Sequence, residues 1–306
     1  KDAADGSVAK LSDGSDSVET AFTATGASMT VKTQASVNTR GLGGRSIVAC
    51  QSLYDSRGRL LATHADLDDE SERLPVNSPE FGTQAADALD GDKMVIAMPG
   101  AEIVDAVGYS RLAVGYEYTL SASLRYADTG EPVVDAQGKE VAGTATFTPE
   151  ATSGTAKVKL GFDAAGLDTS RKLVVFEKLY AGDDLLASHE DKDDAGQTVT
   201  PVIPYIGTVA ADGFDGDKNV VAMPNATVVD TVEYDGVAAG VEHELRATLK
   251  YKDTGEAVKD AKTGEPVTAT AKFTPELSRG KAKVAFSFDG TGIADGSALV
   301  VAEQLY

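Results

Sequence analysis

One stretch of this sequence occurs more than once, and the repetition limits the chain to an array of similar modules. Phe81-Gly82-Thr83 recurs as Ile206-Gly207-Thr208, and most of the sequence after this tripeptide recurs at the same offset of about 125 residues. Residues 173–180 match residues 299–306 and are also similar to residues 47–54. We therefore expect three copies of one module, and the requirements of one module decide the fold.

The repeat predicts three domains of unequal completeness. Residues 77–204 read as a complete module. Residues 1–76 read as the C-terminal part of a module that is truncated at its start, and residues 205–306 read as a module that lacks its last strand. Because both truncations follow the repeat, we expect the sequence to be part of a longer tandem array.

Within each copy, short segments rich in β-branched and aromatic residues alternate with glycine-containing turns. Residues 116–124, 156–162 and 173–176 are examples, and such segments are typical of strands. Their spacing predicts an all-β protein made of immunoglobulin-like β-sandwich modules. Proline-rich junctions at 75–79 and 201–204 are short and stiff, so we expect the modules to be arranged as a rod.

Composition excludes several classes of function. The net charge is -20, which disfavours binding to nucleic acid and direct contact with an anionic membrane surface. The chain has no glycine-rich phosphate loop, metal-ligand pair or nucleophile elbow, so we expect no cofactor, no metal and no turnover enzyme. The single cysteine, Cys50, cannot form an intramolecular disulfide.

Acidic residues occur within apolar runs of the expected strands. Asp105 and Asp230 occupy equivalent positions between β-branched residues, and Glu177 and Glu303 form a second equivalent pair. If Asp105 and Glu177 both face the core they must share a proton, which raises one pKa and lets the pair hold a polarised amide. Strand alternation also allows both side chains to face solvent.

The complete module contains a characteristic set of residues in a fixed order: Gly82, Thr83, the segment 174–177, His189, Asp191, Asp194 and Gln197. The last four follow the spacing His-x-Asp-x-x-Asp-x-x-Gln, and parts of the set recur in the other copies. In this order, repetition and spacing the module resembles the VaFE-repeat, Thr-Gln ester-bond domains of surface adhesins from Gram-positive bacteria, and the resemblance covers nearly the whole chain.

The resemblance implies an autocatalytic ester between the hydroxyl of Thr83 and the side-chain carbonyl of Gln197, with loss of ammonia. In that reaction His189 is the base that takes the threonine proton. The protonated pair Asp105 and Glu177 holds the carboxamide oxygen and stabilises its developing charge. The reaction happens once per molecule.

The family also implies a role and a place for the chain. We expect an extracellular stalk module, anchored to a bacterial cell wall, that contacts neighbouring modules of the same chain. A host or cell-surface ligand would bind a distal domain outside this sequence. An ester between the first and last strands would close a loop of over a hundred residues and add about 4 to 5 kcal/mol in the chain-entropy model.

The first copy departs from the pattern at the reacting position. His64 matches the histidine, but Glu72 stands in place of the glutamine and Gln51 stands in place of the glutamate. An ionised carboxylate is a poorer acceptor than a carboxamide, so no ester is expected there.

The third copy has Thr208, Asp230 and Glu303 but no glutamine strand within this chain. It therefore cannot close by itself, and a single ester is the prediction.

Three alternatives remain open on sequence alone. Lys93 is a candidate nucleophile for a Lys-Asn or Lys-Asp isopeptide, as in other pilin sandwiches, and a plain uncross-linked binding sandwich is the second possibility. The acidic loop 191–196 and the cluster Asp212, Asp215 and Asp217 are the candidates for calcium, although neither completes an EF-hand pattern.

Overall fold

β-Strands are the only regular elements of this protein. The computed structural model describes residues 1–306, and it contains no helix of the length and apolarity needed to cross a membrane. The all-β prediction is confirmed. Two compact units are distinguished: residues 1–80 with 109–114 and 150–153, and residues 81–108, 115–149 and 154–306.

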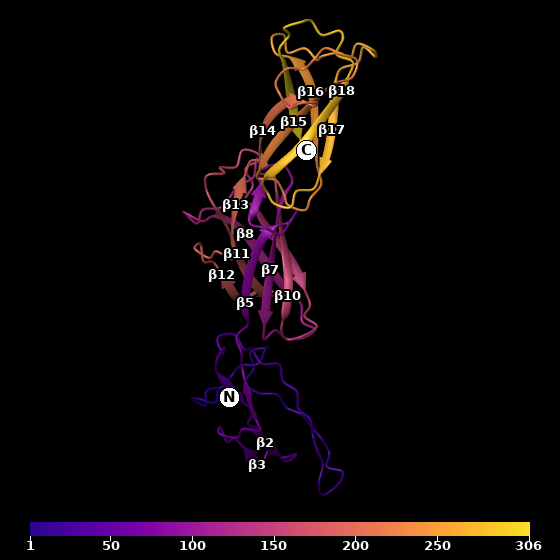
Figure 1. Ribbon diagram of the computed structural model, residues 1–306. Helices are drawn as coiled ribbons and strands as arrows, with labels where there is room; N and C mark the ends of the chain where they lie inside the picture. Colours follow the sequence, from indigo (N-terminus) through magenta and orange to yellow (C-terminus); the bar gives the residue numbers. More distant parts are fainter. The chain divides into compact units, whose positions relative to one another are not determined.

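The middle copy is a sandwich of two sheets (Figure 1). One sheet has three strands in the order β10-β7-β5, and the other has the order β6-β13-β11-β8-β9 with β12 paired to β11. The strands are β5 (Glu80–Asp87), β6 (Met94–Ile96), β7 (Ala101–Ser110), β8 (Tyr118–Tyr126), β9 (Ala142–Phe147), β10 (Gly154–Phe162), β11 (Leu173–Ala181), β12 (Asp184–His189) and β13 (Thr198–Val202).

Alternation along the strands builds the core of this sandwich. Burial alternates strictly along the first seven residues of β7, from Ala101 to Val107, and Ile103 is fully buried. Leu120 on β8 and Leu160 on β10 are likewise removed from solvent. Each such aliphatic side chain contributes about 1.5 to 3 kcal/mol through burial, so the pattern fixes which face of each strand points inward.

The third copy repeats the sandwich with fewer strands. Its sheets have the orders β14-β15-β18 and β17-β16-β19. The strands are β14 (Tyr205–Asp212), β15 (Ala226–Asp235), β16 (His243–Tyr251), β17 (Thr268–Phe273), β18 (Gly280–Phe288) and β19 (Leu299–Leu305). Residues 219–221 match β6 but form no strand, whereas β6 pairs in parallel with β13 in the middle copy.

The first copy has two small strand pairings. The strand β1 (Ser46–Val48) pairs with β4 (Arg73–Pro75), and β2 (Gln51–Tyr54) pairs with β3 (Leu60–His64). Residues 1–45 form isolated bridges and turns but no strand.

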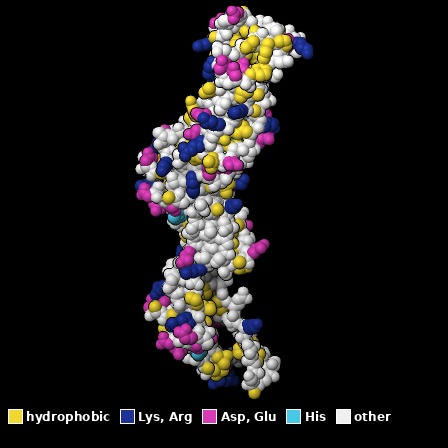
Figure 2. All heavy atoms as spheres, in the orientation of Figure 1, with side chains coloured by type: hydrophobic (Ala, Val, Ile, Leu, Met, Phe, Trp, Pro, Cys, Tyr) yellow, Lys and Arg dark blue, Asp and Glu magenta, His cyan; other side chains and the backbone are white.

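Charged side chains of both signs are scattered over the visible surface. Figure 2 shows acidic and basic groups interspersed on the visible face, on a chain with 48 acidic and 28 basic residues. The acidic excess is therefore distributed along the chain rather than gathered in one place on this face.

Candidate functional site

Two carboxyl groups occupy inward positions of the middle sandwich. Asp105 continues the buried alternation of β7, and Glu177 holds an equivalent inward position on β11. Both side chains are 0% exposed, so they do not face solvent. Because the two strands belong to opposite sheets, the acids meet across the core.

The segment before β13 brings Gln197 to the same place. The carboxylate of Asp194 accepts a hydrogen bond from the backbone N–H of Gly196 at 2.6 Å, and the carbonyl of Asp194 accepts one from Gln197 N–H at 3.2 Å. Asp191 supports the same turn by accepting from Asp193 N–H at 3.0 Å. The spacing His-x-Asp-x-x-Asp-x-x-Gln therefore encodes a self-capped turn that aims the glutamine inward.

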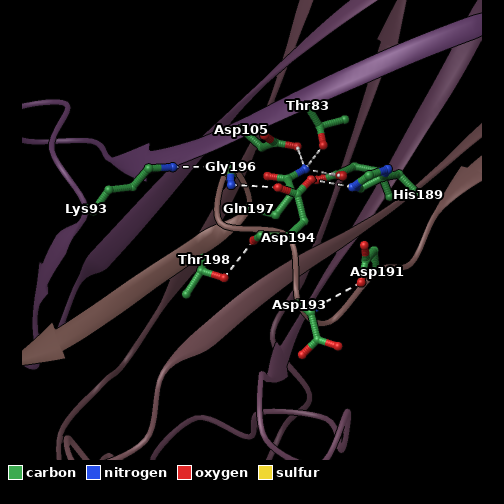
Figure 3. A network of polar contacts seen from close by, with 11 residues as sticks. Thr83, Lys93, Asp105, His189, Asp191, Asp193, Asp194, Gly196, Gln197 and Thr198 are labelled. Carbon is green, nitrogen blue, oxygen red and sulfur yellow. Dashed lines mark hydrogen bonds and ion pairs between the residues drawn. The ribbon is translucent and has the colours of Figure 1, made fainter.

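The carboxamide of Gln197 is the centre of the network (Figure 3). Its Nε2 donates to Thr83 Oγ1, to Glu177 Oε2 at 2.6 Å and to Asp105 Oδ2 at 3.3 Å. Thr83 comes from β5, so the two groups of the expected ester, 114 residues apart in the chain, are in direct contact. Gln197 is 0% exposed and Thr83 is half-buried, so the carboxamide side of the contact is shielded from bulk water.

One detail of this network differs from the expectation. The sequence predicts that the acid pair holds the oxygen of the carboxamide, but the structure turns the nitrogen toward the pair and leaves Gln197 Oε1 without a hydrogen-bond partner. The reason is complementarity, since the NH₂ group is the only donor of a glutamine side chain and the carboxyl oxygens that face it act as acceptors.

Burial keeps the acid pair protonated. It raises the pKa of Glu177 to about 10, and the hydrogen bond and charge of Asp105 act in the same direction. Burial also raises the pKa of Asp105, against the hydrogen bond from Glu177 and the charge of Lys93. At neutral pH the pair therefore holds a shared proton.

His189 lies at the edge of the site. It ends β12 opposite Glu177 in the strand register, and its Nε2 pairs with Asp194 Oδ2 at 2.7 Å. Its ring also lies edge-on to Phe81. No hydrogen bond joins His189 to Thr83, so its role as the base stays a prediction.

Lys93 contacts backbone carbonyls rather than a reacting side chain. Its ammonium donates to the carbonyl of Ala85 and, at 2.6 Å, to that of Gly196. Neither contact is with a carboxamide or a carboxyl group. Sequence reasoning identifies Lys93 only as a candidate nucleophile, although its recurrence as Lys218 indicates a role shared by the copies.

Comparison with known families decides the class of these modules. A family profile described as "T-Q ester bond containing domain" matches residues 4–74, 79–201 and 204–305. The chain belongs to this family. The matches cover all three copies, and Thr83 and Gln197 both lie within the second match.

Solved structures and curated proteins give less information about this chain than the family profile does. Two crystal forms of a bacterial adhesin from Mobiluncus mulieris, described as containing intramolecular disulfide, isopeptide and ester bond cross-links, share 16% sequence identity with the chain. The alignment covers 74% of this chain and 81% of that one, with a TM-score of 0.32. None of the curated proteins compared with the chain matches it.

The third T-Q domain has the same acids without the glutamine. Asp230 is 0% exposed, and burial together with Asp230 raises the pKa of Glu303 to about 8. Thr208 is exposed, whereas Thr83 is half-buried. The acid pair is thus assembled by β15 and β19 in this domain as well, while the threonine is exposed to solvent.

The first T-Q domain keeps the turn but exchanges the reacting groups. His64 pairs with Asp69 at 2.8 Å, as His189 pairs with Asp194. Gln51 Nε2 donates to Glu72 Oε2 at 3.1 Å, so the amide and the acid face each other from exchanged positions, and both are in contact with solvent.

Proposed function

We propose that the middle T-Q domain forms an intramolecular ester between Thr83 and Gln197 without another protein. The observation that supports it is the direct contact of Thr83 Oγ1 with a fully buried carboxamide that is flanked by two carboxyl groups of raised pKa. Holding the two groups together supplies the effective concentration that an unreactive alcohol and amide need.

The chemistry balances as an acyl transfer. Thr83 Oγ1 bonds to the carboxamide carbon of Gln197, the carbon–nitrogen bond breaks, and ammonia leaves. The ionised member of the acid pair accepts the hydroxyl proton, and protonated Glu177, which touches Nε2, supplies the proton that the departing nitrogen needs. The pair ends with the number of protons it began with, and the dry site protects the product from hydrolysis.

We assign the first proton transfer to the acid pair because both acids contact the carboxamide of Gln197, whereas no hydrogen bond joins His189 to Thr83. In this assignment His189 supports the turn that carries Gln197. His189→Gln can still donate to Asp194 but cannot act as a base at neutral pH. The variant should therefore keep most of the rate of ester formation, and a loss of about a hundredfold or more would return the base role to the histidine.

The product is a mechanical staple rather than a catalyst. A bond from β5 to the segment before β13 joins the first and last strands of the domain, so a pull on the chain would pass through a covalent link. We propose on this basis, and on the family resemblance, that the modules serve as the stalk of an extracellular adhesin on a Gram-positive cell wall. A distal domain would carry the ligand site.

Intact mass tests the ester. The chain should be lighter than its sequence by one ammonia, and Thr83→Ala should abolish the difference while Thr208→Ala, the matched change in the third domain, leaves it. Alkaline hydroxylamine should cleave the cross-link of the wild type and of Thr208→Ala, and it should find no cross-link in Thr83→Ala. A wild-type mass equal to that of the sequence would overturn the proposal.

The same experiment separates the isopeptide alternative. A Lys93 isopeptide with an asparagine would also lose ammonia, but it would survive both Thr83→Ala and hydroxylamine. The contacts of Lys93 favour the ester. Its ammonium contacts two backbone carbonyls, and neither contact places it against a carboxamide or a carboxyl group.

A further inference from the structure

Lys93 lies between the two segments that must react. It precedes β6, and the turn that contains Gly91 folds it back onto β5. There its ammonium contacts the carbonyl of Ala85, two residues after Thr83, and the carbonyl of Gly196, one residue before Gln197. Figure 3 shows Lys93 and His189 approaching the Gln197 segment from opposite sides.

The two segments have one other backbone link at this point. The N–H of Ala85 donates to the carbonyl of Gly196 at 3.1 Å. The approach is close enough that a Cβ on Gly196 would lie 3.4 Å from the carbonyl oxygen of Thr83. Thus the carbonyl of Gly196 receives both a strand-type hydrogen bond from β5 and a charged one from Lys93, and charge-assisted bonds are about twice as strong as neutral ones.

The third domain provides the matched case. Lys218 repeats the local half of the arrangement, since its ammonium contacts the carbonyl of Ala210 on β14. No second carbonyl completes the contact, and Lys218 is exposed where Lys93 is half-buried. The hydrogen bond from the lysine to its own β-strand therefore forms without the glutamine segment. The half-buried position of Lys93, in contrast, depends on that segment.

We propose that Lys93 is a positioning residue for ester formation, because its ammonium joins the strand that carries Thr83 to the segment that carries Gln197. The inference rests on the ester reaction proposed above. In this proposal Lys93 holds the hydroxyl of Thr83 close to the carboxamide of Gln197. The rate of such a reaction depends steeply on the distance between the two groups.

The charge of Lys93 has a second, measurable consequence. It acts on Asp105 and on Asp194, and it opposes the burial that raises the pKa of Asp105. The other groups that face Asp105 are Glu177 on β11 and the carboxamide of Gln197, and His189 faces Asp194. Without the ammonium, Asp105 should ionise at a higher pH, so the acidic limb of the rate profile should move upward.

The experiment follows the full chain during cell-free synthesis, with samples quenched in acid and ester formation read as the loss of ammonia by intact mass. Lys93→Met removes the charge and the donors, Lys93→Arg keeps both, and Lys218→Met is the control in the third domain. We expect Lys93→Met to slow the reaction by about tenfold to a hundredfold. Lys93→Arg should recover most of the rate, and Lys218→Met should leave it unchanged.

Two readouts separate positioning from a general loss of structure. Urea midpoints of the same variants are measured in a Thr83→Ala background, where no ester can form, and Lys93→Gln serves if Lys93→Met does not fold. An upward shift of the acidic limb in Lys93→Gln or Lys93→Met supports the proposal.

Equal rates in Lys93→Met and the wild type would overturn the role of Lys93 while leaving the ester intact. A rate loss that Lys93→Arg does not recover, without any shift of the pH profile, would overturn it as well. A wild-type chain that loses no ammonia would instead remove the proposed function itself.

Discussion

The second and third T-Q domains contain the same threonine and the same two acids, yet only one of them has a closed site. In the second, the carboxamide of Gln197 joins both acids and Thr83. In the third, Asp230 is equally buried, but Thr208 is exposed. The sandwich core by itself therefore buries the aspartate, and the glutamine segment is needed to enclose the threonine.

The first domain shows the complementary half of the site. Its turn carries the same histidine–aspartate pair, although Glu72 replaces the glutamine and Gln51 replaces the glutamate. The turn thus forms without a carboxamide at its end. Burial of the acids and formation of the turn are separable properties, and the second domain is where they coincide.

The largest effect is expected from completing the third domain. Residues 181–204 would be appended after Tyr306, in the register in which residues 173–180 match residues 299–306. The added glutamine should reach Thr208, Asp230 and Glu303, so the chain should lose a second ammonia. The new link should stabilise this domain by about 4 to 5 kcal/mol, measured by urea unfolding.

Two controls define that result. Thr208→Ala in the extended chain should lose only one ammonia, and so should an appended segment with glutamate in place of its glutamine, as in Glu72. If the extended chain folds and still loses only one ammonia, the threonine and the two acids are not sufficient for the reaction.

An effect of similar size but opposite sign is expected when Gln197 of the second domain is replaced by the glutamate that the first domain has at this position. Gln197→Glu replaces the carboxamide by an ionisable acid, which is a poorer acyl donor, so the mass should equal that of the variant sequence. Without the link the domain should lose about 4 to 5 kcal/mol of unfolding free energy. Gln84→Glu makes the same chemical change on the exposed side of β5 and should alter neither quantity. Ester formation in Gln197→Glu, read as the loss of water, would show that the reaction does not need a carboxamide.

Exchanging the acid for an amide should slow the reaction without preventing it. Glu177→Gln gives the second domain the residue found at Gln51 and removes the proton that the leaving nitrogen takes. We expect a rate lower by about a hundredfold to a thousandfold, as when one group that stabilises an acyl transfer is removed. Time-resolved intact mass during synthesis measures it, with Glu190→Gln on the exposed surface as the control. An unchanged rate would exclude Glu177 as the proton donor.

The sequence was sufficient for the sandwich fold, and the family resemblance supplied the residues expected in the site. Repetition and period-two alternation specify the strands, but alternation alone allowed Asp105 and Glu177 to face either the core or solvent, and the structure places both in the core. Repeats and alternation are local and periodic, so they can be read from one chain.

The contacts around the carboxamide could not be read in this way. Which atom of Gln197 faces the acids depends on hydrogen-bond complementarity in three dimensions. The pairing of His189 with Asp194 depends on the conformation of the turn between them. The sequence points to Lys93 for its reactivity, but its position is set by two carbonyls from segments more than a hundred residues apart. Contacts of this kind leave no periodic pattern in the sequence, so they cannot be predicted from it in the way that strands are.

A pH dependence, modest within any one pH unit, should also differ between the two acid pairs. Burial and the nearby Asp105 raise the pKa of Glu177 from 4.5 to about 10, and Glu303 reaches about 8. Between the unfolded and folded pKa values the folded state binds more protons, so the unfolding free energy falls as pH rises, by at most about 1.4 kcal/mol per pH unit for one proton. The decline should continue to about pH 10 in the second domain and end near pH 8 in the third.

Hydrogen exchange of the Thr83→Ala chain can read β11 and β19 separately, after correction for the intrinsic pH dependence of exchange. Adding Glu177→Gln should remove the slope at β11 and leave that at β19. Parallel slopes that both end near pH 8 would mean that the glutamine segment does not deepen the burial of the acids. In that case the closed site of the second domain would differ from the open one only in its carboxamide, and proton supply to the leaving nitrogen would depend on the sandwich alone.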